Sequence, residues 1–361
     1  MPHTASSAPA AAVDHSGEAA KASVLQEYLA SCRDLVADHI RAIVPHNRYS
    51  RILYNLALEY PLRLGKGFRP ALCIASTRAQ GGRLQDALRT AAVLELYHNA
   101  FLVHDDVEDG SILRRGESTL HARYGLPIAV NVGDAMFALC LQPLLDNTES
   151  LGLGKALAIL ETVARMARES AEGQAIELDW VRHHAWSQSD RSYCHMAFKK
   201  TCWYTFIAPL RIGGIITGAS PSRLTTLQRF GAYVGIAFQI QDDILNLIAE
   251  ERLYGKEIGG DLWEGKHTVM LLHMMRTAQA RDQSEAQRIL QRPRHRKSAQ
   301  EVEFLWDLMQ RCGSIHYASR LARALAGKGM HVLNADAEPI PESVHRDFLI
   351  GMVDYVVSRN L

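Results

Sequence analysis

Two groups of carboxylates stand out among the residues whose types and spacing could do chemistry. The first lies in FLVHDDVEDG, where Asp105, Asp106 and Asp109 follow an apolar run. On a helix, residues i and i+4 lie one above the other, so Asp105 and Asp109 share a face and Asp106 lies beside them. Carboxylates this close repel unless neutralised, and hard divalent cations such as Mg²⁺ take oxygen ligands. A solvated acidic helix end would explain this first group equally well.

The second group lies in QIQDDILNLIAEE, where Asp242 and Asp243 are adjacent and Asn246 follows Asp242 at i+4. This group sits inside an apolar helical pattern, where paired carboxylates are costly without partners. A structural ion pair could supply those partners, but a buried ion pair is a weak stabiliser. Two similar acidic faces on two apolar helices predict opposite walls of one cavity that holds metal and diphosphate.

Basic residues flank both acidic groups and could bind phosphate. They are Lys66 and Arg69 in LGKGFRPAL, Arg114 and Arg115 after the first group, Lys200 in FKKTCW, and Lys256 and Lys266 after the second group. Lys66 and Arg69 precede or open a predicted helix, whose N-terminus favours anions. Any one of these cations alone reads as a surface charge, but their placement beside both acidic groups favours an anion site.

The elements that must position these side chains are helices. From about residue 22 onward apolar residues recur at helical spacing, for example in ALRTAAVLELYHNAFLVHDD and RFGAYVGIAFQIQDDILNLIAEE. Strand-like alternation is scarce, so we predict an all-α fold, one large helical bundle with a central cavity. We expect a disordered tail at 1–24 and a single helical domain at 25–361. Loops are predicted at 145–154 and 335–342, and a loop or surface helix at 278–300.

Composition narrows the functional classes. The formal net charge is +1, so no global field points to nucleic acid or to an anionic membrane, and any anion site must be local. The six cysteines show no CxxC spacing, which favours reduced thiols in a cytoplasmic protein. No stretch reads as a bilayer span, and the Ala/Ser/Pro-rich N-terminus lacks the apolar core of a signal peptide.

Several short motifs occur together in a fixed order. They are Gly65-Lys66-x-x-Arg69-Pro70, His98, the DDxxD pattern at 105–109 followed by Arg114-Arg115-Gly116, Gly173-Gln174, Lys200-Thr201, and Phe238-Gln239-x-Gln241-Asp242-Asp243. From about residue 50 to 270, this combination resembles the trans-isoprenyl diphosphate synthases, the polyprenyl synthetases that include farnesyl and geranylgeranyl diphosphate synthases. Three positions depart from the family pattern. Gly67 replaces a basic residue, Glu177 is a mild change of acid, and Asn246 replaces an aspartate.

The resemblance implies an isoprenoid synthase fold, a homodimer and a role for each motif. About three Mg²⁺ ions would be held by Asp105, Asp106, Asp109, Asp242 and Asp243, with Asn246 as a further candidate ligand. The allylic diphosphate would also bind Arg114, Lys200, Lys256 and Lys266. Isopentenyl diphosphate would bind Lys66, Arg69, His98 and Arg115, and Thr201 and Gln239 would line the carbocation. The resulting expectation is a chain-elongating prenyltransferase that condenses isopentenyl diphosphate with an allylic diphosphate.

Two other functions fit parts of the pattern. A class I terpene cyclase uses the same helical fold, and Asp242, Asp243, Asn246 and Glu250 approach its metal motif. A cyclase, however, needs no isopentenyl diphosphate site, and Lys66 and Arg69 argue for one. A non-catalytic partner subunit would be expected to have lost acidic ligands, whereas this chain keeps five aspartates in the two groups.

Product length should depend on residues that precede the first acidic group. If the tail runs along this helix, Phe101 and Tyr97 lie four and eight positions before Asp105, with Ala100 beside Phe101. In the family, bulk four and five positions before the motif stops growth early. Here Ala100 is small and Phe101 is large, so we expect geranylgeranyl diphosphate as the product. Alternatively, Tyr97 and Phe101 are ordinary core or interface aromatics.

Overall fold

The protein is an all-α bundle, as the computed structural model describes it for residues 15–63, 65–248 and 259–358. Its helices are α1 His15–Ile43, α2 Asn55–Leu62, α3 Phe68–Ala79, α4 Leu84–Asp109, α5 Leu120–Tyr124, α6 Leu126–Leu139, α7 Leu141–Leu151, α8 Leu153–His183, α9 Asp190–Ala197, α10 Ala208–Thr217, α11 Pro221–Ile248, α13 Gly260–Glu264, α14 Val269–Thr277, α15 Ala280–Leu290, α16 Ala299–Arg311, α17 Ser314–Asn334 and α18 Val344–Ser358. Two π-helices, η1 Ser50–Tyr54 and η2 Phe198–Ile207, and the 3₁₀ turn η3 Arg294–Arg296 complete the helical elements. The predicted fold class is confirmed.

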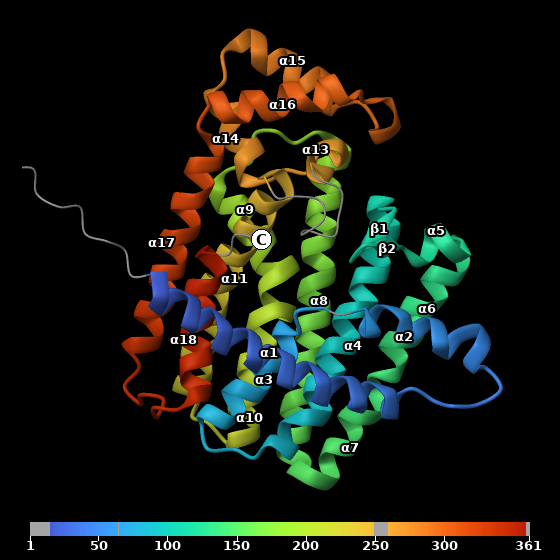
Figure 1. Cartoon of the computed structure of the whole chain (residues 1–361), viewed down its shortest axis with the longest axis vertical. Coiled ribbons are helices and arrows are strands. Elements are labelled where there is room, and N and C mark those ends of the chain that lie inside the picture. Colours follow the sequence, from blue (N-terminus) through green and yellow to red (C-terminus); the bar gives the residue numbers. More distant parts are fainter. Residues whose placement is uncertain (1–14, 64, 249–258, 359–361) are drawn as a thin grey trace, which may run out of the picture.

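The long helices α4, α8 and α11 form the centre of the bundle (Figure 1). Helix α11 packs along α17 and η2, while α3 packs between α10 and α4. The apolar residues of these helices form one continuous core, in which Leu94, Phe206 and Phe230 are almost fully buried. Helices α15 and α16 lie across one end of the molecule (Figure 1). The two acidic groups therefore sit on central helices whose positions are fixed by core packing.

A short hairpin follows the first acidic group. Strand β1, Leu113–Arg114, pairs antiparallel with β2, Glu117–Ser118. The turn between them requires left-handed backbone at Arg115, with φ of 55°, and at Gly116, with φ of 78°. This hairpin turns the chain back after α4, so that Arg114 approaches the carboxylates that precede it.

The predicted boundaries differ from the structure in two places. Helix α1 begins at His15, inside the segment assigned to a tail, where GEAAKAS is rich in strong helix formers. The predicted loop at 145–154 is wrong, because α7 runs to Leu151 and only Gly152 separates it from α8. There the Asn147 side chain donates to Thr90 Oγ1 at 3.0 Å, a tertiary contact that holds a turn-forming sequence in a helix. The segment 278–300 contains α15, and 335–342 carries no helix, as expected.

One stretch of the described chain, Leu126–Leu151, is apolar and long enough to cross a membrane by length and composition. It comprises α6 and α7, its most apolar window has a mean hydropathy of 1.6, and 39% of that window is buried inside the protein. Core helices of globular proteins pass the same test, so this stretch is weak evidence for a membrane span.

Candidate active site

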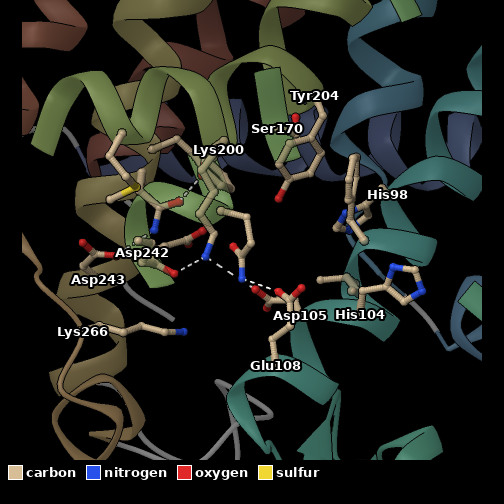
Figure 2. A pocket seen from close by; sticks show the side chains of 18 of the residues that line it. His98, His104, Asp105, Glu108, Ser170, Lys200, Tyr204, Asp242, Asp243 and Lys266 are labelled. Carbon is tan, nitrogen blue, oxygen red and sulfur yellow. Dashed lines mark hydrogen bonds and ion pairs between the residues drawn. The ribbon is translucent and has the colours of Figure 1, made fainter. Parts of the chain in front are cut away.

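A cavity of about 870 Å³ lies between α4, α8, η2 and α11. Figure 2 shows Asp105 and Glu108 on one side of it and Asp242, Asp243 and Lys266 on the other. The two acidic groups therefore form facing walls, as their patterns predict. Asp106, Asp109 and Asn246 are not among the cavity-lining residues, although the sequence assigned them the same role.

The first acidic group occupies the last turn of α4, which ends at Gly110 in a left-handed conformation. The C-terminus of a helix carries partial negative charge, so carboxylates there depend on nearby cations. Asp106 is fully buried, and its carboxylate accepts hydrogen bonds from Arg114 Nε at 2.9 Å and from the Tyr60 hydroxyl at 2.7 Å. Arg114 Nη2 also lies 3.4 Å from Asp105 Oδ2. Arg114 thus neutralises the adjacent pair, while Asp105 lines the cavity.

The second acidic group lies in the last turns of α11. Asp243 accepts hydrogen bonds from the Tyr193 hydroxyl and from Gln239 Nε2, both at 2.7 Å, and the Thr201 hydroxyl donates to Gln239 Oε1 at 2.5 Å. Burial raises the pKa of Asp243 well above its usual value. The side-chain oxygen of Asn246 accepts from the backbone N–H of Asp261 at 3.1 Å. Asn246 thereby fixes the start of α13, and its role as a metal ligand stays a prediction.

Two lysines reach into the cavity between these walls. Lys200 projects from η2, a π-helix, an irregularity that is frequent at functional sites. Its ammonium lies 3.5 Å from Asp105 Oδ1 and also pairs with Glu177. Lys266 donates to Asp109 Oδ2 at 2.7 Å and lies 2.9 Å from Glu264 Oε2. The nearby carboxylates raise the pKa of both lysines against the effect of burial, so both are cationic.

Close helix packing positions Lys200. A Cβ added at Gly173 of α8 would lie 2.1 Å from the backbone nitrogen of Lys200, a distance that no side chain tolerates. Only glycine therefore allows α8 and η2 to approach this closely. The second residue of the Gly173-Gln174 motif links α8 to α4, because Gln174 Nε2 donates a hydrogen bond to Glu108 Oε2 at 2.6 Å.

A second group of basic residues lines another part of the same cavity. Its members are Lys66, Arg69, His98 and Arg115, the residues assigned to isopentenyl diphosphate. Arg69 donates to Thr205 Oγ1 at 2.8 Å and its guanidinium lies over the Tyr204 ring at 4.4 Å. Burial and the neighbouring arginines lower the pKa of His98 well below its usual value, so its imidazole is neutral.

Arg115 and Lys66 complete this group from two other elements. Arg115 donates to the backbone oxygens of Tyr60 at 3.0 Å and Arg63 at 2.6 Å, and its guanidinium lies against Gly65. The exposed Lys66 ammonium lies 5.7 Å from the ring centroid of Tyr355, so α18 borders this part of the cavity. The cation predicted at Lys256 falls outside the described residues.

Of the three residues assigned to product length, only one lines the cavity. Phe101 lines the cavity, whereas Ala100 is fully buried and Tyr97 lies behind Phe101 without lining it. Phe137 of α6 lines the cavity as well, with its ring centroid 5.2 Å from that of Phe101 and 4.8 Å from that of Tyr97. Phe101 and Phe137 therefore form an aromatic part of the cavity lining, and Tyr97 packs against both rings.

The donor set of the cavity fits Mg²⁺. Its lining includes the carboxylates of Asp105, Glu108, Glu177, Asp242, Asp243 and Asp261, and hard divalent cations prefer oxygen ligands. Within 15–63, 65–248 and 259–358, no three metal-binding side chains come together closely enough to hold an ion by themselves. Mg²⁺ commonly takes one or two carboxylates and completes its shell with substrate phosphates and water. Asp105 and Asp242, on opposite walls, are placed for such shared binding.

Comparison with known proteins agrees with this geometry. The polyprenyl synthetase family model matches residues 51–309. The chain belongs to the polyprenyl synthetase family. It is 32% identical to the octaprenyl diphosphate synthase of Escherichia coli over 296 residues, 82% of this chain and 86% of that protein.

Two solved structures of polyprenyl synthetases share the fold. The geranylgeranyl pyrophosphate synthetase from Pyrococcus horikoshii aligns over 94% of this chain and 99% of its own, with a TM-score of 0.82 and 31% identity. The polyprenyl synthase from Caulobacter crescentus, complexed with calcium and isoprenyl diphosphate, aligns over 94% and 97%, with a TM-score of 0.81 and 28% identity. These relatives place the chain among enzymes that make prenyl diphosphates of different lengths.

Several residues of the site carry no sequence signal of their own. They are Glu108, Phe137, Glu177 and Tyr193, which line the cavity, and Tyr60, whose backbone oxygen binds the cavity-lining Arg115. Glu177, a departure from the family pattern, pairs with Lys200. Phe137 belongs to an apolar helix with no charge to mark it, and the two tyrosines lie far from their aspartates in sequence. For these residues only the folded chain supplies the signal.

Proposed function

We propose that this polyprenyl synthetase elongates an allylic diphosphate with isopentenyl diphosphate in an Mg²⁺-dependent reaction and releases mainly geranylgeranyl diphosphate. One observation carries the proposal. The same cavity contains two facing acidic walls with Lys200 and Lys266, and also a separate group of cations at Lys66, Arg69 and Arg115. Two diphosphates need two such anion sites. A terpene cyclase has one diphosphate substrate, so the second group favours elongation over cyclisation.

The residues of the chain suit the steps of this reaction. Lys200 and Lys266 exchange carboxylate partners for oxygens of the allylic diphosphate and stabilise the charge of the leaving group. Bound Mg²⁺ would supply further charge at that leaving group. Thr201 and Gln239 present oxygen dipoles toward the allylic cation, and the apolar lining, including Phe238, limits access of water. Arg69 and Lys66 hold isopentenyl diphosphate so that its double bond attacks the cation, and the released diphosphate accepts the proton.

Product length follows from the aromatic end of the cavity. Phe101 and Phe137 stop the growing tail, and Tyr97 stops any tail that passes between them. Because the relatives include both geranylgeranyl and octaprenyl synthases, the length is a property of this chain's own residues. Phe137→Ala should shift the main product to a longer prenyl diphosphate, measured by mass spectrometry. Phe304→Ala on the distant α16 serves as the control, and an unchanged product in Phe137→Ala would refute this account of length.

We further propose a cytoplasmic homodimer. Exposed apolar side chains follow one another on α6, α7 and the first turns of α8, and they are Leu126, Ile128, Val130, Leu141, Leu145, Leu153 and Leu157. An apolar surface of this extent is characteristic of a protein interface. A second copy of the chain, packed through the same helices, would bury it in an isologous contact.

A further inference from the structure

One aspartate of each adjacent pair is bound by a tyrosine hydroxyl. Tyr60 of α2 donates to Asp106 Oδ2, and Tyr193 of α9 donates to Asp243 Oδ2, each at 2.7 Å. Both tyrosines are about 1% exposed, and they come from elements that carry none of the acidic motifs. The same arrangement thus occurs twice, on facing walls of the cavity, in segments unrelated in sequence.

The second oxygen of each tyrosine-bound aspartate is also occupied. Asp106 Oδ1 accepts from Arg114 Nε at 2.9 Å, and Asp243 Oδ1 accepts from Gln239 Nε2 at 2.7 Å. Both carboxylates are buried, with exposed fractions of 0% for Asp106 and 6% for Asp243. Asp105 and Asp242 are less buried than these neighbours, and both line the cavity, as does Asp243, whereas Asp106 does not.

The hydroxyl protons are directed toward the carboxylates. The Tyr60 oxygen accepts the backbone N–H of Leu120 at 3.3 Å, so its own proton points to Asp106. Without its tyrosine, Asp243 Oδ2 would lose its hydrogen-bond donor, and Asp106 Oδ2 would keep only Arg114 Nε at 3.1 Å, so each carboxylate would be less firmly held.

We propose that Tyr60 and Tyr193 are positioning residues that hold Asp106 and Asp243 out of the metal shell, so that Asp105 and Asp242 present their oxygens to the divalent cation. Adjacent residues on a helix point about 100° apart, so fixing one carboxylate also fixes the direction of the other. This inference rests on the proposed metal-dependent function. It adds two residues outside the acidic motifs that determine which aspartates reach the ion.

The test measures metal binding as well as turnover. Tyr60→Phe and Tyr193→Phe each remove one hydroxyl, and Tyr28→Phe removes a hydroxyl bonded to His345 on distant helices. Calorimetry with inorganic pyrophosphate over a series of Mg²⁺ concentrations should show that the first two variants need about 10- to 100-fold more Mg²⁺, the range typical when a residue that orients a metal site is lost, because a released Asp106 or Asp243 would change the direction of its neighbour. Their KM for isopentenyl diphosphate should stay within about twofold of the wild-type value, because the side chains proposed to bind this substrate are not changed.

The possible results distinguish a positioning role of the two tyrosines from a purely structural one. Wild-type Mg²⁺ dependence in both phenylalanine variants would overturn the inference. The inference would also be overturned if both variants had a lower melting temperature and bound Mg²⁺ and isopentenyl diphosphate with similarly reduced affinity. That result would indicate a structural role alone. If the wild-type protein itself bound pyrophosphate without regard to Mg²⁺, the proposed function would fail instead.

Asparagine variants provide a second test that does not depend on the tyrosines. Asp105→Asn and Asp242→Asn should abolish Mg²⁺-dependent pyrophosphate binding, whereas Asp106→Asn and Asp243→Asn should weaken it and leave it measurable. Equal and complete loss in all four variants would contradict the division of each pair, even if a tyrosine variant failed to fold.

Discussion

At the scale of single residues, the two groups of cations assign the two substrates to different parts of the cavity. Lys200 and Lys266 are paired with carboxylates on the metal walls. Lys66 is exposed, and among the described residues its ammonium has no carboxylate partner; it lies near the ring of Tyr355. A diphosphate that arrives at Lys66 therefore displaces no internal ion pair.

Lys66→Ala should raise the KM for isopentenyl diphosphate about tenfold or more, because one charge-assisted phosphate contact contributes about 1.5–3 kcal/mol. The KM for the allylic diphosphate should change little. Steady-state kinetics with each substrate varied in turn provides the measurement. Arg168→Ala, which removes an exposed charge on α8, is the matched control. A change in the allylic KM alone would place Lys66 at the wrong diphosphate.

The residue scale also shows what spacing can and cannot predict. The i, i+4 rule correctly separates Asp105 from the adjacent Asp106, which points away from the cavity toward Tyr60 and Arg114. The same rule pairs Asp105 with Asp109, yet Asp109 binds Lys266 instead of lining the cavity. Periodicity gives the direction of a side chain from its helix axis, but not the cation that a distant segment brings beside it.

At the scale of elements, the contact between α8 and η2 sets the position of Lys200. Gly173→Ala should destabilise the protein by about 1–3 kcal/mol, the usual result of overpacking, and should lower activity because Lys200 moves from Asp105 and Glu177. Gly154→Ala lies in the same helix with nothing within 4 Å of the added Cβ and should leave both properties intact. Thermal melts and turnover of the two variants provide the comparison. Similar behaviour of the two glycines would contradict the role assigned to the close approach.

Helices and their faces were predictable from sequence because apolar periodicity directly reflects burial. The long patterns that end in the acidic groups became α4 and α11. The segment 145–154 was not predictable, since its turn-forming residues are held in α7 by a contact between Asn147 and Thr90 from a distant helix. Of the two aromatic residues that line the cavity beside Tyr97, only one could be predicted from the sequence. Phe101 follows from its spacing to Asp105, whereas Phe137 comes from the packing of α6 on α4.

At the scale of the whole molecule, α6, α7 and the first turns of α8 leave several large apolar side chains exposed, among them Leu141 and Leu145. Leu141→Lys combined with Leu145→Lys should convert a dimer into a monomer, because two charges would have to be buried in the interface. Light scattering after size-exclusion chromatography gives the mass. Val344→Lys, an exposed position on α18, is the control. A wild-type protein that elutes as a monomer at all concentrations would contradict the proposal.

The central claim is that the cavity joins two diphosphate substrates. The most direct test is one incubation of the purified protein with Mg²⁺ and each allylic diphosphate, with and without isopentenyl diphosphate, followed by mass spectrometry of the products. We predict geranylgeranyl diphosphate as the main product, formed only when isopentenyl diphosphate and Mg²⁺ are both present. A hydrocarbon or alcohol formed from an allylic diphosphate alone, with no chain extension when isopentenyl diphosphate is added, would contradict the account and identify a cyclase.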